Sequence, residues 1–580
     1  MTSGDEPKQL LRLAALASLI GLVAGGAAWA LVHLIALVTN VALFHRYGWE
    51  LPNFSDLEIN PLVVVTAVCG AALVSLLAKW SPVIRGHGLP ETMEAILTRQ
   101  SRISPRTAVA KPLSAALAIG TGGPFGAEGP IIVTGGALGS LIGQAVRVSP
   151  SQRKILLASG AAAGMAATFG SPLAAVVLAI ELLLFEFSAR AFIPLVVAAS
   201  VAGGVHAQLF GSGPLFNVPD HDFSGLGQLP LFAIVGVGSG LLAVVIAKGL
   251  FLVEALYRRL PIGETWHPML GAAAFASLGL VVPRALGVGY DVIDDALAGR
   301  LALGTLAALA VGKLVIWWIA LASGTSGGTL APILIISSTS GALLGQFLAE
   351  SFPGLGLSAP SVALVAMAAT FGAAARAPFA AIVFLFELTR DYDAILPLMG
   401  ATVLADLVAR ALLADSIMTE KLTRRGLLVP NAFHVDAMRT TSVGEVMSAD
   451  VVTIPADLSL AALTRHFDTG AHTAYPVTDD GGRLVGIVTQ RDVVNASGDV
   501  TAREIAESQV VVASPSEAVA TALQRMLEER VDHLPVLDEG RLVGICTRTD
   551  VLHTRRRVIE HERAQRGWLG RSEPDAPPKV

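Results

Sequence analysis

The chain has 580 residues, of which 53% are hydrophobic and 15% are charged, and its mean hydropathy is +0.63. A soluble domain carries about 25% charged residues, so this composition argues against an ordinary soluble protein and indicates a chain embedded in a bilayer. The formal net charge of −5 does not resemble that of a nucleic-acid-binding protein. Cys69 and Cys546 stand far apart without a partnering motif, which argues against a disulfide framework or a CxxC metal site.

Charged residues are sparse between Leu10 and Leu413 and dense from Lys421 onward. We therefore predict a membrane domain over residues 1–430 and a soluble region after it. Apolar runs that meet the spanning criterion of about 20 residues recur throughout the first part. They cover residues 11–44, 60–80, 108–145, 153–185, 190–210, 229–256, 267–286, 301–349 and 360–413.

Glycine and proline interrupt two of these runs, in GTGGPFGAEGP (Gly120–Pro130) and SGTSGGTLAP (Ser323–Pro332). Broken helices at membrane depth are tolerated only where they pack in protein or line a cavity, so the breaks mark a pathway. Both segments belong to an internal repeat, because each is followed by AATFG, a proline and an apolar helix with one glutamate, Glu181 or Glu387. Paired broken segments in two related halves predict a substrate site between the halves.

A basic cluster, KLTRRG (Lys421–Gly426), follows the last apolar run and predicts a cytoplasmic location for the C-terminal region. That region contains a second repeat, formed by Tyr475–Val493 and Leu534–Val551. Each copy has two β-branched runs joined by a polar turn and followed by a helix start, which predicts a β-β-α piece of a small α/β module. Residues 558–580 are predicted to be disordered, since they are rich in proline and charge.

Three glycine motifs share a character that suits anion binding: GHGLP (Gly86–Pro90), GAEGP (Gly126–Pro130) and GGTLAP (Gly327–Pro332). An anion that crosses lipid must exchange its hydration shell for protein donors without being trapped. Backbone N–H groups at helix N-termini supply such donors at the positive end of the macrodipole. Glycine allows the backbone to come close to the ion.

In this order and within a repeat, the glycine motifs resemble the anion-filter motifs of the CLC chloride channels and antiporters, usually written GSGIP, G(K/R)EGP and GxFxP. The resemblance covers nearly the whole membrane part. It implies an all-α polytopic protein of the plasma (inner) membrane, with a CLC-type inverted repeat of broken and re-entrant helices, assembled as a homodimer. It implies no enzymatic activity and no metal. Anion binding is assigned to Gly86, His87, Gly88, Gly126, Ala127, Gly129, Thr329 and Leu330.

Glu128 matches the family's gating glutamate, whose carboxylate competes with chloride for the outermost anion site and swings away when protonated. The alternative is a structural carboxylate that offsets the dipole at a helix N-terminus. An ionisable residue inside an apolar run favours the functional role. Lys111 matches a lysine that makes the family's anion path electropositive. It could equally be a residue near a helix end whose ammonium group reaches toward the membrane surface.

The chain departs from the family pattern at several positions. His87 replaces a serine that offers its hydroxyl to the central chloride. Its imidazole could donate an N–H to the anion and make transport pH-dependent, or could turn away and bond a carbonyl. Leu330 replaces a phenylalanine, and Ala127 replaces a basic residue, so the outer mouth loses one positive charge. The family's central tyrosine is missing, and Ala414 or Met418 takes its place.

The family's antiporters carry an inner glutamate, the second of a Glu-Glu pair, that hands protons toward the cytoplasm. Here the pair is Glu181-Leu182, so that position is apolar, and we expect a structural role for Glu181. A proton that crosses a low-dielectric interior needs titratable groups or water at short intervals. We therefore expect channel-like or weakly proton-coupled chloride transport, with chloride/proton antiport as the alternative. His87 or a chain of waters would carry any protons that move.

The C-terminal repeat resembles a pair of CBS domains, predicted over residues 441–497 and 498–557 as a cytoplasmic α/β pair. In that family, the aspartate of a TxxD element holds the ribose of an adenine nucleotide, and the threonine lies beside the phosphates. The alternative is a structural pair without a ligand. A CBS-regulated cation transporter is disfavoured, because the membrane part lacks a segment with two or three facing carboxylates. The implied nucleotide site comprises Thr489, Asp492, Thr547 and Asp550.

Overall fold

The computed structural model describes residues 5–218, 226–352, 354, 356–427, 429, 438, 441–470 and 472–553. The chain divides into two compact units, Met1–Phe433 and His434–Val580, which we call the membrane unit and the C-terminal unit. The tail predicted to be disordered, residues 558–580, lies outside the described residues.

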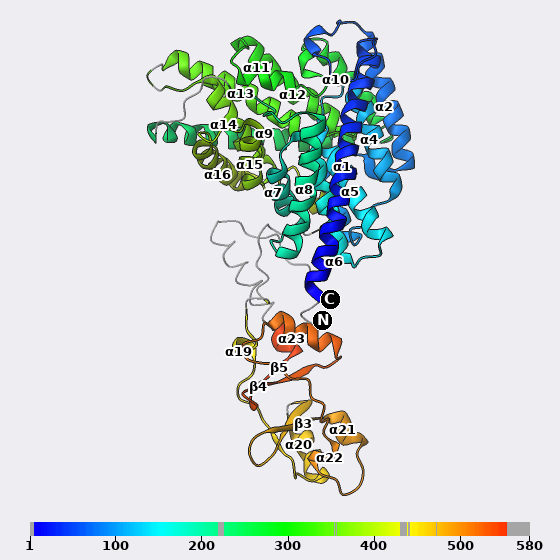
Figure 1. Cartoon of the computed structure of the whole chain (residues 1–580), viewed down its shortest axis with the longest axis vertical. Helices are drawn as coiled ribbons and strands as arrows, with labels where there is room; N and C mark the ends of the chain where they lie inside the picture. The colour runs from blue at the N-terminus through cyan, green and yellow to red at the C-terminus, as the bar shows by residue number, and fades with distance from the viewer. Residues whose placement is uncertain are drawn as a thin grey trace. The chain divides into compact units, whose positions relative to one another are not determined.

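The membrane unit is built from helices joined by short connections, as the all-α class predicts (Figure 1). Many of these helices have a proline in the first turn, where its missing N–H would have no helical partner. After α7 the chain makes a π-helical turn over Ile180–Leu184. The helices are α1 (Asp5–Leu43), α2 (Leu62–Trp80), α3 (Leu89–Thr98), α4 (Pro105–Gly120), α5 (Glu128–Ala145), α6 (Pro150–Phe169), α7 (Pro172–Ala179), α8 (Ala189–Leu209), α9 (Leu229–Arg258), α10 (His267–Gly279), α11 (Tyr290–Leu297), α12 (Leu303–Ala322), α13 (Leu330–Ser351), α14 (Ala359–Ala375), α15 (Pro378–Thr389), α16 (Ile395–Leu412) and α17 (Glu420–Arg424).

Seven helices in the described part of the chain are long and apolar enough to cross a bilayer: α1, α2, α8, α9, α12, α13 and α16. The protein is therefore an integral membrane protein. With 39 residues, α1 is about 58 Å long, well beyond the roughly 30 Å of hydrocarbon in a bilayer, so it must tilt or project from the membrane. Figure 1 shows α1 running beside α8, against which it packs.

The two halves of the membrane unit repeat the same order of elements. In the first half, α2 is followed by the 3-10 turn η2 (Pro82–Ile84), α3, α4 and α5. In the second half, α10 is followed by η5 (Pro283–Ala285), α11, α12 and α13. Gly126, before α5, and Gly328, before α13, form an antiparallel β-bridge, so the corresponding segments meet in opposite directions. The repeated order of elements agrees with the predicted repeat of two halves.

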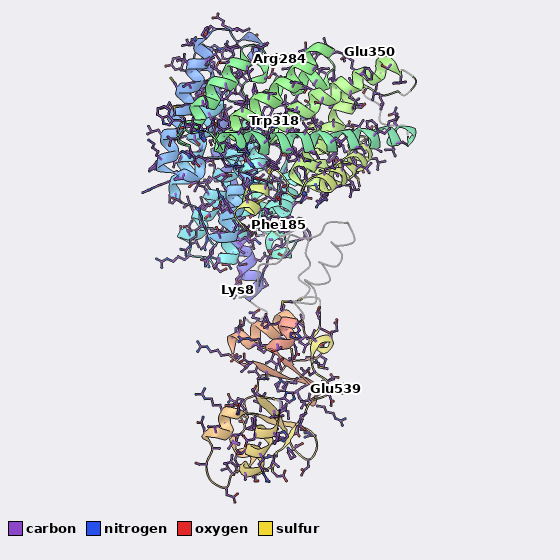
Figure 2. All side chains as sticks on the ribbon, turned by 180° about the vertical axis from the view of Figure 1, so that it is seen from behind. Lys8, Phe185, Arg284, Trp318, Glu350 and Glu539 are labelled. Atoms are coloured by element: carbon purple, nitrogen blue, oxygen red, sulfur yellow. The ribbon has the colours of Figure 1, made fainter. Side chains whose placement is uncertain are left out.

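Both predicted breaks are present between helices. The chain between α4 and α5 and the chain between α12 and α13 are not helical. Figure 2 places Glu350, near the C-terminus of α13, at the end of the membrane unit opposite Lys8 and Phe185. Leu330, the first residue of α13, is buried. This helix therefore begins inside the protein and runs outward to one surface, as a broken helix around a central site must.

The glutamates of the two repeated apolar helices hold the opposite half of the protein. Glu181 accepts a hydrogen bond from the N–H of Ala380 at 2.9 Å, in the first turn of α15. Glu387, on α15, accepts bonds from the N–H groups of Leu173 and Ala174 at 3.0 and 2.7 Å, in the first turn of α7. Each carboxylate satisfies donors that have no partner within their own helix. Glu181 thus has the structural role expected from the sequence.

The C-terminal unit contains two small sheets and several short helices. The first has the order β1-β2-β3, with β1 parallel and β3 antiparallel to β2, and the second pairs β4 with β5 in antiparallel register. The predicted β-β-α pieces are β2-β3-α21, and β4-β5 followed by helical residues 548–553. The elements are α19 (Val443–Val446), β1 (Ile454–Pro455), α20 (Leu460–Thr469), β2 (Ala474–Thr478), β3 (Leu484–Thr489), α21 (Gln490–Asn495), α22 (Ala502–Ile505), α23 (Val519–Glu528), β4 (His533–Asp538) and β5 (Arg541–Thr547).

The two sheets lie in separate hydrophobic cores that exchange short segments of chain. Val443, at the start of the unit, packs in the core of β4 and β5, whereas Ala502 packs in the core of β1 to β3. The segment that precedes β1 therefore stabilises the core of β4 and β5, and the segment that precedes β4 stabilises the core of β1 to β3. Burial raises the pKa of the Cys546 thiol to about 11, so this cysteine is protonated at neutral pH and packs as an apolar residue.

Candidate functional site

The loops of the three glycine motifs meet inside the membrane unit, at a place that we call the junction. The N–H of Gly86 donates to the carbonyl of Thr325 at 3.2 Å, which ties the first motif to the loop that leads into the third. The N–H of Gly328 donates to the carbonyl of Gly126 at 2.9 Å, which ties the third motif to the second. The structure therefore brings together the segments that sequence analysis assigned to anion binding.

Glycine is required at the junction because the backbones touch. A Cβ atom on Gly129 would lie 1.9 Å from the carbonyl oxygen of His87, and one on Gly88 would lie 2.5 Å from the carbonyl oxygen of Gly129. Gly86 and Gly88 also have φ values of +103° and +101°, which residues with a side chain rarely adopt. Both restrictions apply at the same place, so the first motif can approach the second only with glycine.

Three helices begin at the junction: α3 at Leu89, α5 at Glu128 and α13 at Leu330. The first N–H groups of a helix have no partner within that helix and lie at the positive end of its dipole. The neighbouring Ala127, Thr329 and Leu330 are 5%, 4% and 6% exposed, so bulk water does not satisfy these donors. The arrangement suits an anion or a carboxylate.

The Glu128 carboxylate lies in the junction and is 2% exposed. Its Oε1 accepts a hydrogen bond from the hydroxyl of Tyr290 at 2.7 Å. Its Oε2 has no hydrogen-bond partner among the described residues. This oxygen lies so close to Gly126 and Gly328 that Cβ atoms there would be 1.7 and 2.7 Å away. The carboxyl group therefore occupies the space between the second and third motifs.

Two buried lysines support corresponding loops in the two halves. Lys111 Nζ donates to the carbonyl oxygens of Ile84 and Gly86 at 2.8 and 2.9 Å, directly behind the first motif. Lys313 Nζ donates in the same way to Ala285 and Gly287 at 3.0 and 2.7 Å. Both side chains are 0% exposed, so the Lys111 ammonium group does not reach the membrane surface.

Comparison with known proteins decides the family. The family model described as "Voltage gated chloride channel" matches residues 69–410, and the CBS domain model matches residues 443–499 and 502–557. This chain belongs to the CLC family. It is 30% identical to the H(+)/Cl(−) exchange transporter ClcA of Salmonella agona, over 62% of this chain and 79% of that protein.

Solved structures agree with the assignment to the CLC family. The structure of a slow cyanobacterial Cl−/H+ antiporter superposes with a TM-score of 0.63 and 26% identity, over 71% of this chain and 98% of the other. The structure of a eukaryotic CLC transporter superposes with a TM-score of 0.59 and 22% identity, over 93% of this chain and 98% of the other. The second likeness shows the shared fold alone.

Among the CLC departures, His87 has the most distinctive surroundings. It is 1% exposed, and neither ring nitrogen has a partner with hydrogen-bond geometry among the described residues. The backbone of Ile417 and the side chains of Lys111 and Lys421 lie near the ring. A buried polar group without a partner is costly, so a ligand or water at this position would stabilise the histidine.

The segment that lacks the CLC tyrosine lies partly inside the protein. Met418 is 1% exposed, whereas Ala414 is exposed, so Met418 is the one of the two that packs in the interior. Leu182 is 3% exposed and packs in the hydrophobic core of the membrane unit. The resemblance predicted the loss of a glutamate at Leu182 and of a tyrosine at Ala414 or Met418. Of these apolar residues, Leu182 and Met418 are buried.

Two cavities lie beside the first two glycine motifs of this CLC protein. One has a volume of about 340 Å³ and is lined in part by Ala127, His206 and Tyr290, next to Glu128. The other has a volume of about 350 Å³ and is lined in part by Thr92, on α3, and by several charged residues. Those charged residues are Arg85, Glu91, Glu94, Arg99, Arg102 and Arg425.

In the CBS pair, the threonine and aspartate of each TxxD element hold one another. The hydroxyl and the N–H of Thr489 donate to Oδ2 of Asp492 at 2.6 and 2.9 Å, and those of Thr547 donate to Oδ2 of Asp550 at 2.7 and 2.8 Å. Each pair caps the helical turn that follows the strand. The conformation of both elements is therefore fixed without a ligand.

Sequence analysis missed Tyr290 and Lys313. The signal was the segment LGVGYD, which stands in the second half where RGHGLP stands in the first and shares with it two glycines in GxG spacing. A GxG pair alone is too common to identify a repeat. The carbonyl bonds made by Lys111 and Lys313 establish the correspondence, because they recur at the same points of the two loops.

We predict that Gly129→Ala reduces anion flux by about tenfold or more, because the new methyl group would force the first and second motifs apart. Gly136→Ala is the matched control: it lies on the same helix, and its Cβ would meet its nearest neighbours at 3.6 Å, an ordinary contact. Flux measured in proteoliposomes, normalised to folded protein, distinguishes the two. Equal flux from both variants would contradict the packing described for the junction.

Proposed function

We propose that this CLC protein transports chloride or a similar small anion across the membrane through the junction, with the Glu128 carboxylate as the gate. The observation that carries the proposal is the position of this carboxylate. It lies between the second and third motifs, beside the first turns of α5 and α13, where backbone donors also favour a free anion. A charged carboxylate and an anion cannot occupy that space together, so one displaces the other.

Protonation supplies the opening step in this proposal. A carboxylate that has taken up a proton loses the charge that the helix N-termini stabilise, so it leaves the anion site more readily. The cavity lined by Ala127 and Tyr290 gives water and protons a route to the gate. Anion flux should therefore rise as the solution on that side becomes more acidic.

The mode of transport in the proposal is channel-like or weakly coupled to protons. Its support is the burial of Leu182 in an apolar core, at the position where the resemblance places the proton-carrying glutamate of the antiporters. Isolated charges are costly in such surroundings. Chloride/proton exchange is the second candidate, and two relatives favour it, since one is named an exchange transporter and another an antiporter.

The remaining expectations concern location and assembly. The basic cluster at Lys421–Gly426 supports a cytoplasmic position for the CBS pair. A homodimer in the plasma (inner) membrane is the assembly that the CLC resemblance implies. In the proposal, the partners are thus the lipid bilayer, the transported anion and a second copy of the chain.

We predict that Glu128→Gln makes anion flux nearly independent of external pH and holds it close to the acidic maximum. Glutamine resembles the protonated side chain in shape and cannot carry the competing charge. Flux through proteoliposomes over a range of external pH tests this expectation. A variant that retains the full pH response at normal expression would remove Glu128 from the gating role.

A chloride gradient should drive little proton uptake into proteoliposomes when the membrane potential is clamped, because Leu182 offers no proton site. Leu182→Glu should increase proton uptake per chloride moved, if the variant folds. Uptake is followed with a pH electrode or a trapped dye, and protein-free vesicles give the leak. Uphill proton movement by the unmodified protein, at a fixed chloride-to-proton ratio, would establish the exchange candidate instead.

For the CBS pair, we propose an adenine nucleotide as regulatory ligand, with Asp492 and Asp550 bonding the ribose. Asp492→Ala is expected to weaken binding by about 1.5–3 kcal/mol, the range for a hydrogen bond to a charged group. Glu504→Ala is the matched control, because Thr501 and Glu504 form the same kind of cap outside the TxxD elements. Calorimetry on the purified protein measures both. Absence of heat with ATP, ADP and AMP at millimolar concentration would leave the pair without this ligand.

A further inference from the structure

The loop before α11 is held rigidly by a buried charge. Lys313 Nζ donates to the carbonyl oxygens of Ala285 and Gly287, and the side chain is 0% exposed. A buried ammonium group that lost these acceptors would be left without partners in low-dielectric surroundings, which is costly. The chain then passes through Gly289, which has a φ of +81°, and enters α11 at Tyr290. The backbone position from which the Tyr290 side chain projects is therefore fixed.

The ring of Tyr290 is equally constrained. Phe169 and Phe216 pack against it edge-on, with ring centroids 6.3 and 6.2 Å away. Such packing leaves the ring few alternative rotamers. The hydroxyl of Tyr290 lies 2.7 Å from Oε1 of Glu128. The loop fixed by Lys313 and the packed ring therefore hold this hydroxyl against the proposed gating carboxylate.

The carboxylate of Glu128 has few other polar contacts. Oε2 has no hydrogen-bond partner among the described residues, and the titratable groups that act on the carboxylate are Tyr290 on α11 and Lys313 on α12. The first turns of α5 and α13 offer it only backbone groups, those of Glu128 itself and of Ala331. The Tyr290 hydroxyl is thus the side-chain donor that keeps the charged carboxylate in place.

We propose that Tyr290 is the latch of the gate: its hydroxyl holds the charged Glu128 carboxylate in the closed position, and Lys313 positions the loop from which it projects. This inference rests on the proposed role of Glu128 as the gate. A hydrogen bond from a neutral phenol is stronger to a carboxylate than to a carboxylic acid, so the latch favours the closed, charged form. Tyr290 also lines the 340 Å³ cavity, and its hydroxyl is available to water or an incoming anion once the carboxylate has left.

The test is Tyr290→Phe, which removes the hydroxyl and keeps the ring that packs against Phe169 and Phe216. Without the bond, the charged gate is less stable, and it opens at lower proton concentration. The external pH at half-maximal anion flux should shift toward neutral by about one to two units. A shift of this size is expected when a charged group loses one hydrogen bond. Tyr257→Phe is the control: this buried tyrosine on α9 packs against His267, and its replacement should leave the midpoint unchanged.

The double variant with Glu128→Gln separates the latch from other roles of Tyr290. If the hydroxyl acts through the carboxylate, Tyr290→Phe changes nothing further in the Glu128→Gln background. A midpoint unchanged by Tyr290→Phe, with pH response abolished by Glu128→Gln, would overturn the latch and leave the gate standing. An equal effect of Tyr290→Phe with and without Glu128 would also overturn it. A full pH response in Glu128→Gln would overturn the gate and the latch together.

Discussion

The membrane unit depends on one constraint, the cost of placing negative charge where bulk water is absent. A carboxylate or a free anion in such a place must be stabilised by fixed donors. Helices that begin inside the protein provide these donors, because their first N–H groups have no helical partner. The breaks before α5 and α13 and the close approach of Gly88 to Gly129 all serve to bring helix starts to one place. The Glu128 carboxylate occupies that place in the structure.

Burying positive charge creates the complementary requirement, and the two lysines meet it in the same way. An ammonium group has three donors and no acceptor, so a buried lysine must find carbonyl oxygens. Lys111 and Lys313 take theirs from the loops before α3 and α11, and each thereby fixes the start of a short helix. In the first half that helix follows His87, and in the second it begins with Tyr290. The same lysine–carbonyl contact, repeated in the two halves, thus fixes the backbone beside two different side chains.

Much of this arrangement was predictable from the sequence, and the limits have physical causes. The glycine motifs, Glu128 and the β-β-α repeats carry local signals, because a helix start or a tight turn requires particular residues within a few positions. The caps made by Glu181 and Glu387 join helices about two hundred residues apart. No local pattern reveals such a partner. For the same reason Lys111 could not be distinguished from a lysine near the membrane surface until its carbonyl partners were known.

In the proposed function, the two halves of the anion path differ in the side chains that they offer to an ion or a proton. The Glu128 carboxylate accepts a hydrogen bond from Tyr290, which lines a cavity of about 340 Å³. At the positions where the resemblance places polar side chains, this chain has the buried Leu182 and Met418, and His87, whose ring has no hydrogen-bond partner among the described residues. An apolar wall offers no binding site for a proton and no strong bond to an anion. In the proposed function, control over the flux therefore lies with the Glu128 carboxylate, because these apolar side chains offer neither a charge nor a proton site.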